Sequence, residues 1–444
     1  MNRFVALAIL ALGLCVAPIA QSALPPGYGG VLRVPGTAGL RLPDPTDVRT
    51  PLEATVVAGV YDTLYTLRGN RVVPSLAAAL PEMEGDIARV RLRQGIRRHD
   101  RRPLTARDVV RAFRPLLRST SEPWLSGLAR RGGGLDMRAE DETTIAFRLE
   151  DPEFDLARRL AATPLSIRLG QGHGTGPYRA RLRDGALHLY QFRPAARGAP
   201  RLRAIHIEPA RSRDDELRAF DLGELDVSWR GASLYGQPGR EVVRHALPAS
   251  TPVLLVPQAR QRGRLGPLAR TIDRRRLARV GLDPGDHIGD LPAPVARGSQ
   301  TGALRLMVVA GDPLQEELAA ALAARFDEVG WRTTILRKDS TRYDVLVRTD
   351  QWDLRIVQLP PPLPDDRSLL AAAWIAVGSP DRARELLGGA GPDRVAQAAR
   401  ELPAIVLGQR QRTMHHLPTL RGVEHDPWGR VLLHRAFLPR SDEP

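Results

Sequence analysis

The most regular pattern of apolar and polar residues lies between positions 302 and 357. Residues 304–309 form a short apolar run that is typical of a buried strand. Asp312 then has the position of a helix N-cap, with Pro313 at the first helical position. One face of the predicted helix carries Leu314, Leu318, Leu322, Phe326 and Val329. Residues 331–336 form the next expected strand, so the pattern predicts a β-α-β unit with a parallel, right-handed crossover.

Shorter elements are predicted around this unit. Strands are expected at residues 31–34, 89–93, 143–149, 343–347 and 352–357, and helices at 52–61, 106–117 and 154–160. Thr105 is a good N-cap for the helix that starts at residue 106, and Asp108 favours the positive end of that helix. The fold class expected from these elements is α/β.

The N-terminus has the pattern of an export signal. Arg3 precedes an apolar run at residues 4–20, and the small residues of Gln21-Ser22-Ala23 follow. This arrangement predicts a signal peptide at residues 1–23 and an exported mature chain. Cys15, the only cysteine, lies inside the apolar run. It would make the protein a lipoprotein if it were lipidated, although the preceding Leu12-Gly13-Leu14 fits a lipidation motif poorly.

The composition narrows the functional classes. With 444 residues the chain can form about two or three domains. The net charge is +15, but Lys338 is the only lysine and the arginines are spread along the whole chain. Because they form no compact basic block, a biased composition is favoured over nucleic-acid binding.

No cluster of reactive residues indicates an enzyme. The sequence contains no GxSxG or HExxH motif, and no cysteine remains after the signal segment. His415 and His416 are adjacent, so on a strand they would point to opposite faces; a surface metal site with His425 and His434 is the less favoured alternative. The glycines at residues 170–176 match neither a phosphate loop nor a dinucleotide fingerprint and are expected to form a turn. No enzymatic activity, metal or cofactor is therefore predicted.

Several short motifs occur in a fixed order, beginning in the run of residues 60–113. GTGPY at 174–178 is the most specific of them. The others are HD at 99–100 with PLTA at 103–106 and DVV at 108–110, DETTI at 141–145 with FRL at 147–149, FRP at 192–194 with RG at 197–198 and PRL at 200–202, LGELDV at 222–227, TIDR at 271–274 and WDL at 352–354. In this order they resemble the extracellular solute-binding proteins of family 5, the peptide- and nickel-binding type that serves ABC importers. Arg101 replaces the glycine that usually follows the HD pair.

The resemblance implies a two-lobed, periplasmic-binding-protein-like fold of type II, with a small subdomain inserted into lobe one. The expected boundaries are 24–74, 165–250 and 408–444 for lobe one, 75–164 for the inserted subdomain and 251–407 for lobe two. A small solute or short peptide would bind in the interlobe cleft of a periplasmic monomer and pass to an ABC permease. The alternative is a degenerate scaffold that acts as a periplasmic sensor or interaction protein without transport.

The resemblance also suggests residues that face the ligand. They are Tyr61, Asp62, Trp229, Gln258, Gln358 and Asp365. Core packing is the alternative role for Tyr61 and Trp229, solvent-exposed hinge polarity for Asp62, Gln258 and Gln358, and an ordinary loop position for Asp365. Pro362 falls where peptide-binding members carry an aspartate that pairs with the amine of the peptide. Since proline has no carboxylate, amine capture at that position is not expected.

Overall fold

The computed structural model describes most of the chain. The described ranges are 29–37, 39–210, 212–236, 239–272, 277–278, 282–283, 302–349 and 351–439. The predicted signal peptide, Cys15 and the last residues of the TIDR motif lie outside them. Within these ranges, no helix is both long enough and apolar enough to cross a bilayer.

Lobe one is built on a four-stranded sheet in the order β1-β12-β11-β10. Its elements are β1 (Val31–Gly36), β10 (Tyr178–Arg183), β11 (Ala186–Gln191) and β12 (Ala204–Pro209), together with α1 (Pro51–Val60), α4 (Arg213–Asp221) and β13 (Val227–Ser228). β1 and β12 are parallel although about 170 residues separate them. Thr50 and Glu53 form a capping box that starts α1, whose inner face joins the core of this sheet.

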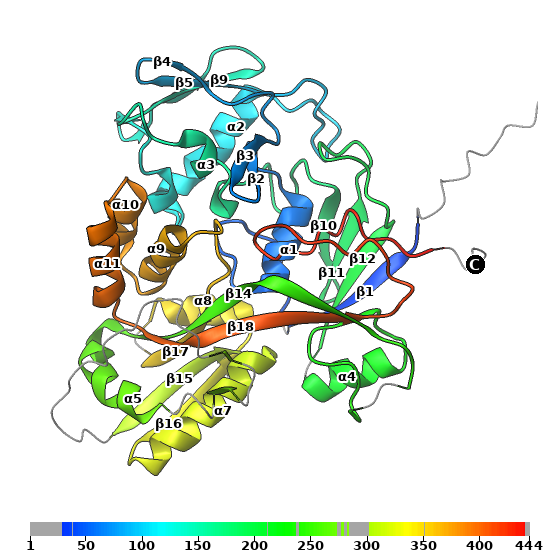
Figure 1. Ribbon diagram of the computed structural model, residues 1–444, viewed down its shortest axis with the longest axis vertical. Coiled ribbons are helices and arrows are strands. Elements are labelled where there is room, and N and C mark those ends of the chain that lie inside the picture. The colour runs from blue at the N-terminus through cyan, green and yellow to red at the C-terminus, as the bar shows by residue number, and fades with distance from the viewer. Residues whose placement is uncertain are drawn as a thin grey trace, which may run out of the picture.

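Two long strands connect lobe one to lobe two. β14 (Val243–Pro257) and β18 (Ile405–His416) pair antiparallel within a six-stranded sheet of order β13-β18-β14-β17-β15-β16. In Figure 1 they run across the middle of the molecule, from the sheet of lobe one to that of lobe two. The two segments are far apart in sequence, so the connection between the lobes depends on their pairing.

The predicted β-α-β unit is confirmed in lobe two. β15 (Ala303–Val309) and β16 (Arg332–Lys338) are parallel, and α7 (Pro313–Glu328) joins them with Asp312 as its N-cap. The other elements of this lobe are η4 (Ala259–Arg264), α5 (Leu265–Thr271), α8 (Ser340–Val347) and β17 (Leu354–Gln358). The strand expected at 343–347 is wrong, because this segment is α8. The Tyr343 ring is buried with Met307, Val309 and Trp352, so packing on the sheet selects the helix.

The 75–164 segment has its own small sheet, of order β4-β5-β9-β8. In and next to it lie β2 (Tyr65–Arg68), β3 (Arg71–Pro74), β4 (Glu82–Glu84), β5 (Ile87–Arg91), α2 (Ala106–Phe113), η1 (Arg114–Arg118), η2 (Glu122–Leu125), β6 (Arg130–Arg131), β7 (Gly134–Leu135), β8 (Met137–Ala139), β9 (Thr144–Arg148), α3 (Leu156–Arg159) and η3 (Thr163–Leu165). Thr105 and Asp108 form the capping box of α2, as predicted. The α-helix ends earlier than expected, at Phe113, since Pro115 cannot donate a helical hydrogen bond and the chain continues as the 3₁₀ helix η1.

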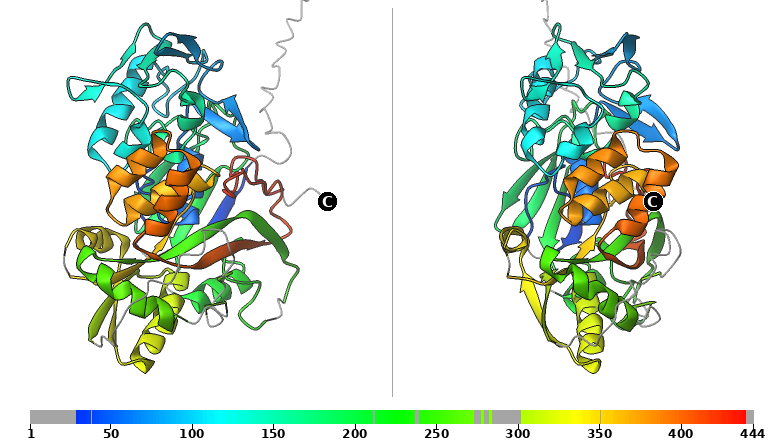
Figure 2. Two further views of the ribbon diagram at one scale, coloured as in Figure 1. Left: turned by 60° about the vertical axis from the view of Figure 1, so that its left-hand side comes forward. Right: turned by 90° about the vertical axis from the view of Figure 1, so that its left-hand side faces the viewer.

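Three helices of the expected lobe two pack against the 75–164 segment. α9 (Asp366–Ala376), α10 (Pro380–Leu387) and α11 (Pro392–Glu401) share one continuous apolar core with it. Figures 1 and 2 show these helices against the elements of that segment. Arg384 of α10 pairs with Glu122 of η2 at 2.7 Å. The core of the lobe-two sheet is a separate cluster.

Candidate ligand-binding site

Two cavities lie between the lobes. The first, which we call the β18 cavity, has a volume of about 400 Å³. Lobe one contributes residues 35–37, the start of α1, and Trp229 with Arg230 after β13. Lobe two contributes Asp312 and Gln358, and the connecting strand β18 supplies the remaining wall.

The second, which we call the proline-loop cavity, has a volume of about 710 Å³. It is lined by residues 44–49 of lobe one, residues 118–121 and Trp124 of the 75–164 segment, and residues 355–362 of lobe two. Gln358 lines both cavities. Both volumes fall within the range that suits small-molecule sites, about 300–1,000 Å³.

A buried ion pair forms one side of the β18 cavity. Arg230 Nε lies 2.8 Å from Glu216 Oε2, and both side chains are almost completely buried. Burial raises the pKa of Glu216 and lowers the pKa of Arg230, and the attraction between the two opposes each shift. Arg230 Nη2 also donates to the main-chain oxygen of Gly311 at 3.4 Å. Arg230 therefore links lobe one to the end of β15 in lobe two.

On the opposite side, Asp312 and Gln358 form a buried polar pair. Asp312 accepts hydrogen bonds from the Gln315 backbone N–H and from Gln358 Nε2. Burial raises the pKa of the Asp312 carboxyl, against the charges of Arg410 and Arg230. Asp312 thus caps α7 and fixes the Gln358 amide at the same time.

The wall formed by β18 is cationic. Arg410, Arg412 and His415 all line the cavity. Arg412 Nη2 donates to the main-chain oxygen of Gly429 at 3.1 Å, and burial lowers the pKa of Arg412 to about 10. Burial also lowers the pKa of His415, which favours its neutral form. At neutral pH the permanent charge of this wall therefore comes from the two arginines.

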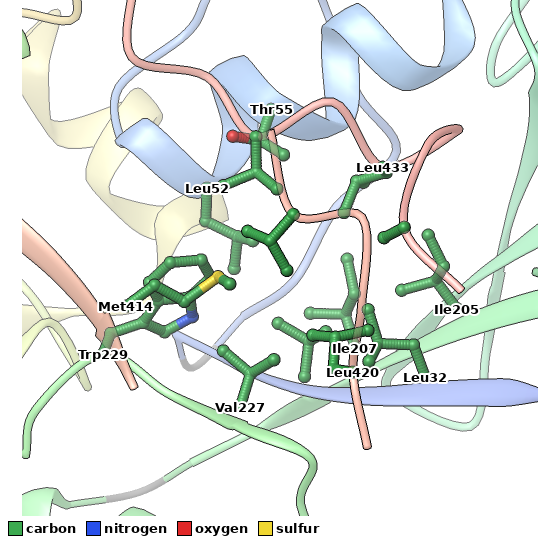
Figure 3. Close-up of a pocket in the computed structure, with 14 residues that line it drawn as sticks. Leu32, Leu52, Thr55, Ile205, Ile207, Val227, Trp229, Met414, Leu420 and Leu433 are labelled. Carbon is green, nitrogen blue, oxygen red and sulfur yellow. The ribbon is translucent and has the colours of Figure 1, made fainter. Parts of the chain in front are cut away.

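Two of the residues suggested from the sequence lie at these cavities. Gln358 lines both. Trp229 lines the β18 cavity, and its Nε1 donates to the main-chain oxygen of Pro35 at 3.1 Å. The other side of Trp229 borders a void of about 20 Å³ in the lobe-one core, which is room for about one water molecule. Figure 3 shows Trp229 there among apolar side chains such as Met414 and Leu52. Trp229 therefore separates the apolar core from the cleft.

The other four residues line neither cavity. Tyr61 is buried in the lobe-one core, where its hydroxyl donates to the Pro43 oxygen and accepts from the Gly172 N–H. Asp62 is buried beside Arg197 and Thr175. Gln258 donates to the Thr349 oxygen behind the cleft. Asp365 is the N-cap of α9 and pairs with Arg158 at 3.2 Å.

Arg230, Asp312 and Arg410 were not among the residues suggested from the sequence. Asp312 was recognised there only as a helix N-cap, and Arg230 directly follows Trp229. Arg410 is one of many arginines, and no local motif distinguishes it. Only the pairing of β18 with β14 brings it beside Asp312.

The family model described as bacterial extracellular solute-binding proteins, family 5 middle, matches residues 71–245. This match bears out, over residues 71–245, the resemblance to the family 5 solute-binding proteins. No curated protein sequence is significantly similar to it. The match includes the 75–164 segment, the GTGPY turn and the start of β14, so it covers the scaffold on the lobe-one side of the cleft.

Solved structures show the same fold over nearly the whole chain. The Escherichia coli murein tripeptide binding protein MppA aligns with a TM-score of 0.75 and 16% identity, covering 93% of this chain and 99% of its own. The periplasmic binding protein DppA from Helicobacter pylori, in complex with the peptide STSA, aligns with a TM-score of 0.73 and 15% identity, covering 93% of this chain and 99% of its own. NikA from Staphylococcus aureus, in complex with Ni(L-His)2, aligns with a TM-score of 0.71 and 14% identity, covering 93% of this chain and 100% of its own. Each is a two-lobed binding protein, which confirms the expected fold class.

Proposed function

We propose that this protein is the substrate-binding component of an ABC importer and captures a peptide or other small solute between its lobes. The observation that carries the proposal is the β18 cavity, whose walls come from lobe one, lobe two and the strand that connects them. A solute held there would contact both lobes and stabilise the closed arrangement. A permease can then distinguish the loaded from the empty protein.

The proposal includes the location and partners of the protein. Residues 1–23 would direct export to the periplasm, and Cys15 would add a lipid anchor only if it were the modified residue. The protein would act as a monomer and deliver its solute to a permease in the inner membrane. It would not bind nucleic acid, hold a metal or cofactor, or catalyse a reaction, in keeping with a family of binding proteins.

The relatives support peptides or metal complexes as the first solutes to test. The structural neighbours include proteins crystallised with a peptide and with Ni(L-His)2. The loop at residues 360–362, however, offers no carboxylate for a peptide amine. The Pro362 oxygen instead accepts hydrogen bonds from the Thr163 N–H at 3.1 Å and from Trp428 Nε1 at 3.0 Å. These contacts tie the loop to the 75–164 segment and to the C-terminal part of lobe one, and they favour a solute other than an ordinary peptide.

The same contacts support the alternative of a sensor or interaction protein. Trp428 of lobe one and Thr163 of the 75–164 segment both hold residues 360–362, which would oppose opening of the cleft. A scaffold that stays closed could still present a surface to a partner. It would not exchange solute at the rate that an importer needs.

Native mass spectrometry of protein purified from its own host tests the main proposal. A co-purified small molecule is expected, and adding it to ligand-free protein at about 100 times Kd should raise the free energy of unfolding by about 2.7 kcal/mol. Gln358→Ala should weaken its binding. Gln258→Ala, a change of the same residue type outside both cavities, should leave Kd unchanged. Absence of any co-purified molecule, with no stabilisation by peptides or nickel complexes, would leave the sensor alternative.

A further inference from the structure

Unpartnered polar atoms gather at the β18 cavity. Among the described residues, a small set of buried side-chain nitrogen and oxygen atoms has no hydrogen-bond partner. Four of these atoms belong to side chains that line this cavity: Arg230 Nη1, Arg412 Nε, His415 Nδ1 and Gln358 Oε1. Leaving a buried polar group without a hydrogen bond costs about 1–3 kcal/mol. Such a cluster therefore indicates a site where a polar ligand supplies the missing hydrogen-bond partners.

The cations of this cavity retain unused hydrogen-bond donors, whereas its two buried acids, Glu216 and Asp312, are already paired. Glu216 is occupied by Arg230, Ser228 and the Trp229 N–H. Asp312 is occupied by Gln315 and Gln358. The half-buried guanidinium of Arg410, in contrast, has no hydrogen bond or ion pair to any described residue. The nearby charges of Asp312, Arg230 and Arg412 act on it. Glu317 also lines the cavity but is exposed to solvent.

The geometry points to an oxyanion as the anchoring group of the ligand. We infer that a carboxylate or phosphate of the solute binds between Arg410 and Arg230 Nη1, while a donor group of the solute pairs with Gln358 Oε1. Arg230 is 94% buried at its side chain and Gln358 is 96% buried, so both would bind the ligand in a nearly dry environment. Charge-assisted hydrogen bonds from guanidinium groups are the strong interactions in such a place. This inference rests on the proposed function and assigns the chemistry of its ligand.

The chemistry of the ligand can be tested on the unmodified protein, before any variant is made. The probes are trialanine, N-acetyl-trialanine, trialanine amide and inorganic phosphate, each measured by isothermal titration calorimetry. Trialanine and its N-acetyl form should bind alike, because the amine is not needed, and the amide should bind about 10- to 100-fold more weakly. Binding of phosphate without either acid peptide would assign the site to phosphorylated solutes. Binding of the amide but not of the N-acetyl form would show amine capture and overturn the inference, while the proposed function would stand.

Arg410→Gln locates the site. It should weaken binding of an anionic probe about 10- to 100-fold. Arg181→Gln removes the same charge from the exposed face of β10, outside both cavities, and should leave Kd unchanged. An equal effect of the two changes, or none from Arg410→Gln, would overturn the inference.

The molecule that co-purifies from the host separates failure of this inference from failure of the proposed function. A molecule with a carboxylate or phosphate, lost from the Arg410→Gln protein and kept by Arg181→Gln, supports the inference and identifies the oxyanion. A cationic or neutral molecule overturns the inference alone. If no small molecule co-purifies and none of the probes binds, the proposed function fails and the inference fails with it.

Discussion

Asp62 Oδ1 lies 2.6 Å from Arg197 Nε, and the Asp62 side chain is only 1% exposed. The other carboxylate oxygen accepts from Thr175 Oγ1 at 2.7 Å, inside the GTGPY turn. Asp62 thus joins the end of α1, the GTGPY turn and the loop after β11 into one rigid unit of lobe one. It serves this junction and not the cavities between the lobes.

Replacing Asp62 with alanine should therefore destabilise the protein without a specific effect on the ligand. Arg197 would lose a buried counter-charge, which costs about 3–5 kcal/mol of unfolding free energy. Urea denaturation measures this loss. Asp184→Ala removes the acid of an exposed pair, Arg183–Asp184, and should change stability by less than about 1 kcal/mol. If Asp62→Ala weakened ligand binding while its stability stayed near that of the wild type, Asp62 would have to be a ligand contact.

Arg159 is expected to hold α10 against the 75–164 segment. The residue is 8% exposed, and its guanidinium donates to the main-chain oxygens of Leu387, Trp124 and Ser126. Arg159→Ala leaves these carbonyls unsatisfied and should lower the unfolding free energy by about 2–4 kcal/mol. The neighbouring Arg158→Ala breaks only a partly exposed ion pair with Asp365, so the unfolding free energy should fall by less than about 1 kcal/mol. Hydrogen exchange should also show the amides of α10 losing protection in Arg159→Ala and not in Arg158→Ala.

Arg101 occupies a backbone conformation that suits glycine. Its φ is +68°, and the motif that this turn resembles has glycine at this position. Arg101→Gly should raise the unfolding free energy by up to about 1 kcal/mol, because the left-handed region strains any residue with a Cβ. Arg102→Gly, at the next position, has no such strain to relieve and should lower stability in the same urea titration. Equal effects of the two changes would contradict this account.

Stability should fall below about pH 6.5 through His99. The His99 Nδ1 accepts from the Gly174 N–H, its Nε2 faces the Gly176 oxygen, and burial lowers its pKa to about 4. Between pH 6.5 and 4 the unfolded chain binds more protons than the folded one, so stability decreases as the pH falls through this range and levels off below it. The contribution of His99 to the unfolding free energy at neutral pH is on the order of 3 kcal/mol.

His99→Gln tests this pH dependence. The variant should be less stable than the wild type at pH 8 but should lose less stability between pH 7.5 and 5. His434, whose pKa burial also lowers to about 4, keeps part of the dependence in both proteins. Parallel stability curves for the two proteins over this range would show that His99 does not contribute.

The sequence correctly predicted those elements that depend on interactions between residues close together in the chain. The caps at Thr105 and Asp312 and the apolar face of α7 depend on neighbours within one or two turns. Both caps are confirmed. The face is confirmed at Leu314, Leu318, Leu322 and Phe326, whereas Val329 lies at the C-cap and is exposed. The prediction failed at residues 343–347. A strand was expected there, but the segment is the helix α8, whose Tyr343 is buried with Met307 and Trp352 against the sheet.

The candidate site was predicted less well than the fold. Trp229 and Gln358 lie at the cavities, whereas Tyr61 and Asp62 belong to the core of lobe one. The residues that were missed, Arg230 and Arg410, are ordinary arginines in a chain with many. They matter because their side chains are buried or half-buried and keep unused hydrogen-bond donors. Neither property can be recognised from a short stretch of sequence.

The sequence by itself determined the α/β class, the order of the family motifs and the absence of an aspartate at position 362, since each follows from residues close together in the chain. The tertiary structure alone decided which side chains share a cavity. β14 and β18 are separated by about 150 residues, and their pairing brings Arg410 beside Asp312 and opposite Arg230. Contacts at such separations depend on how whole elements pack, and no short segment of the sequence specifies that packing.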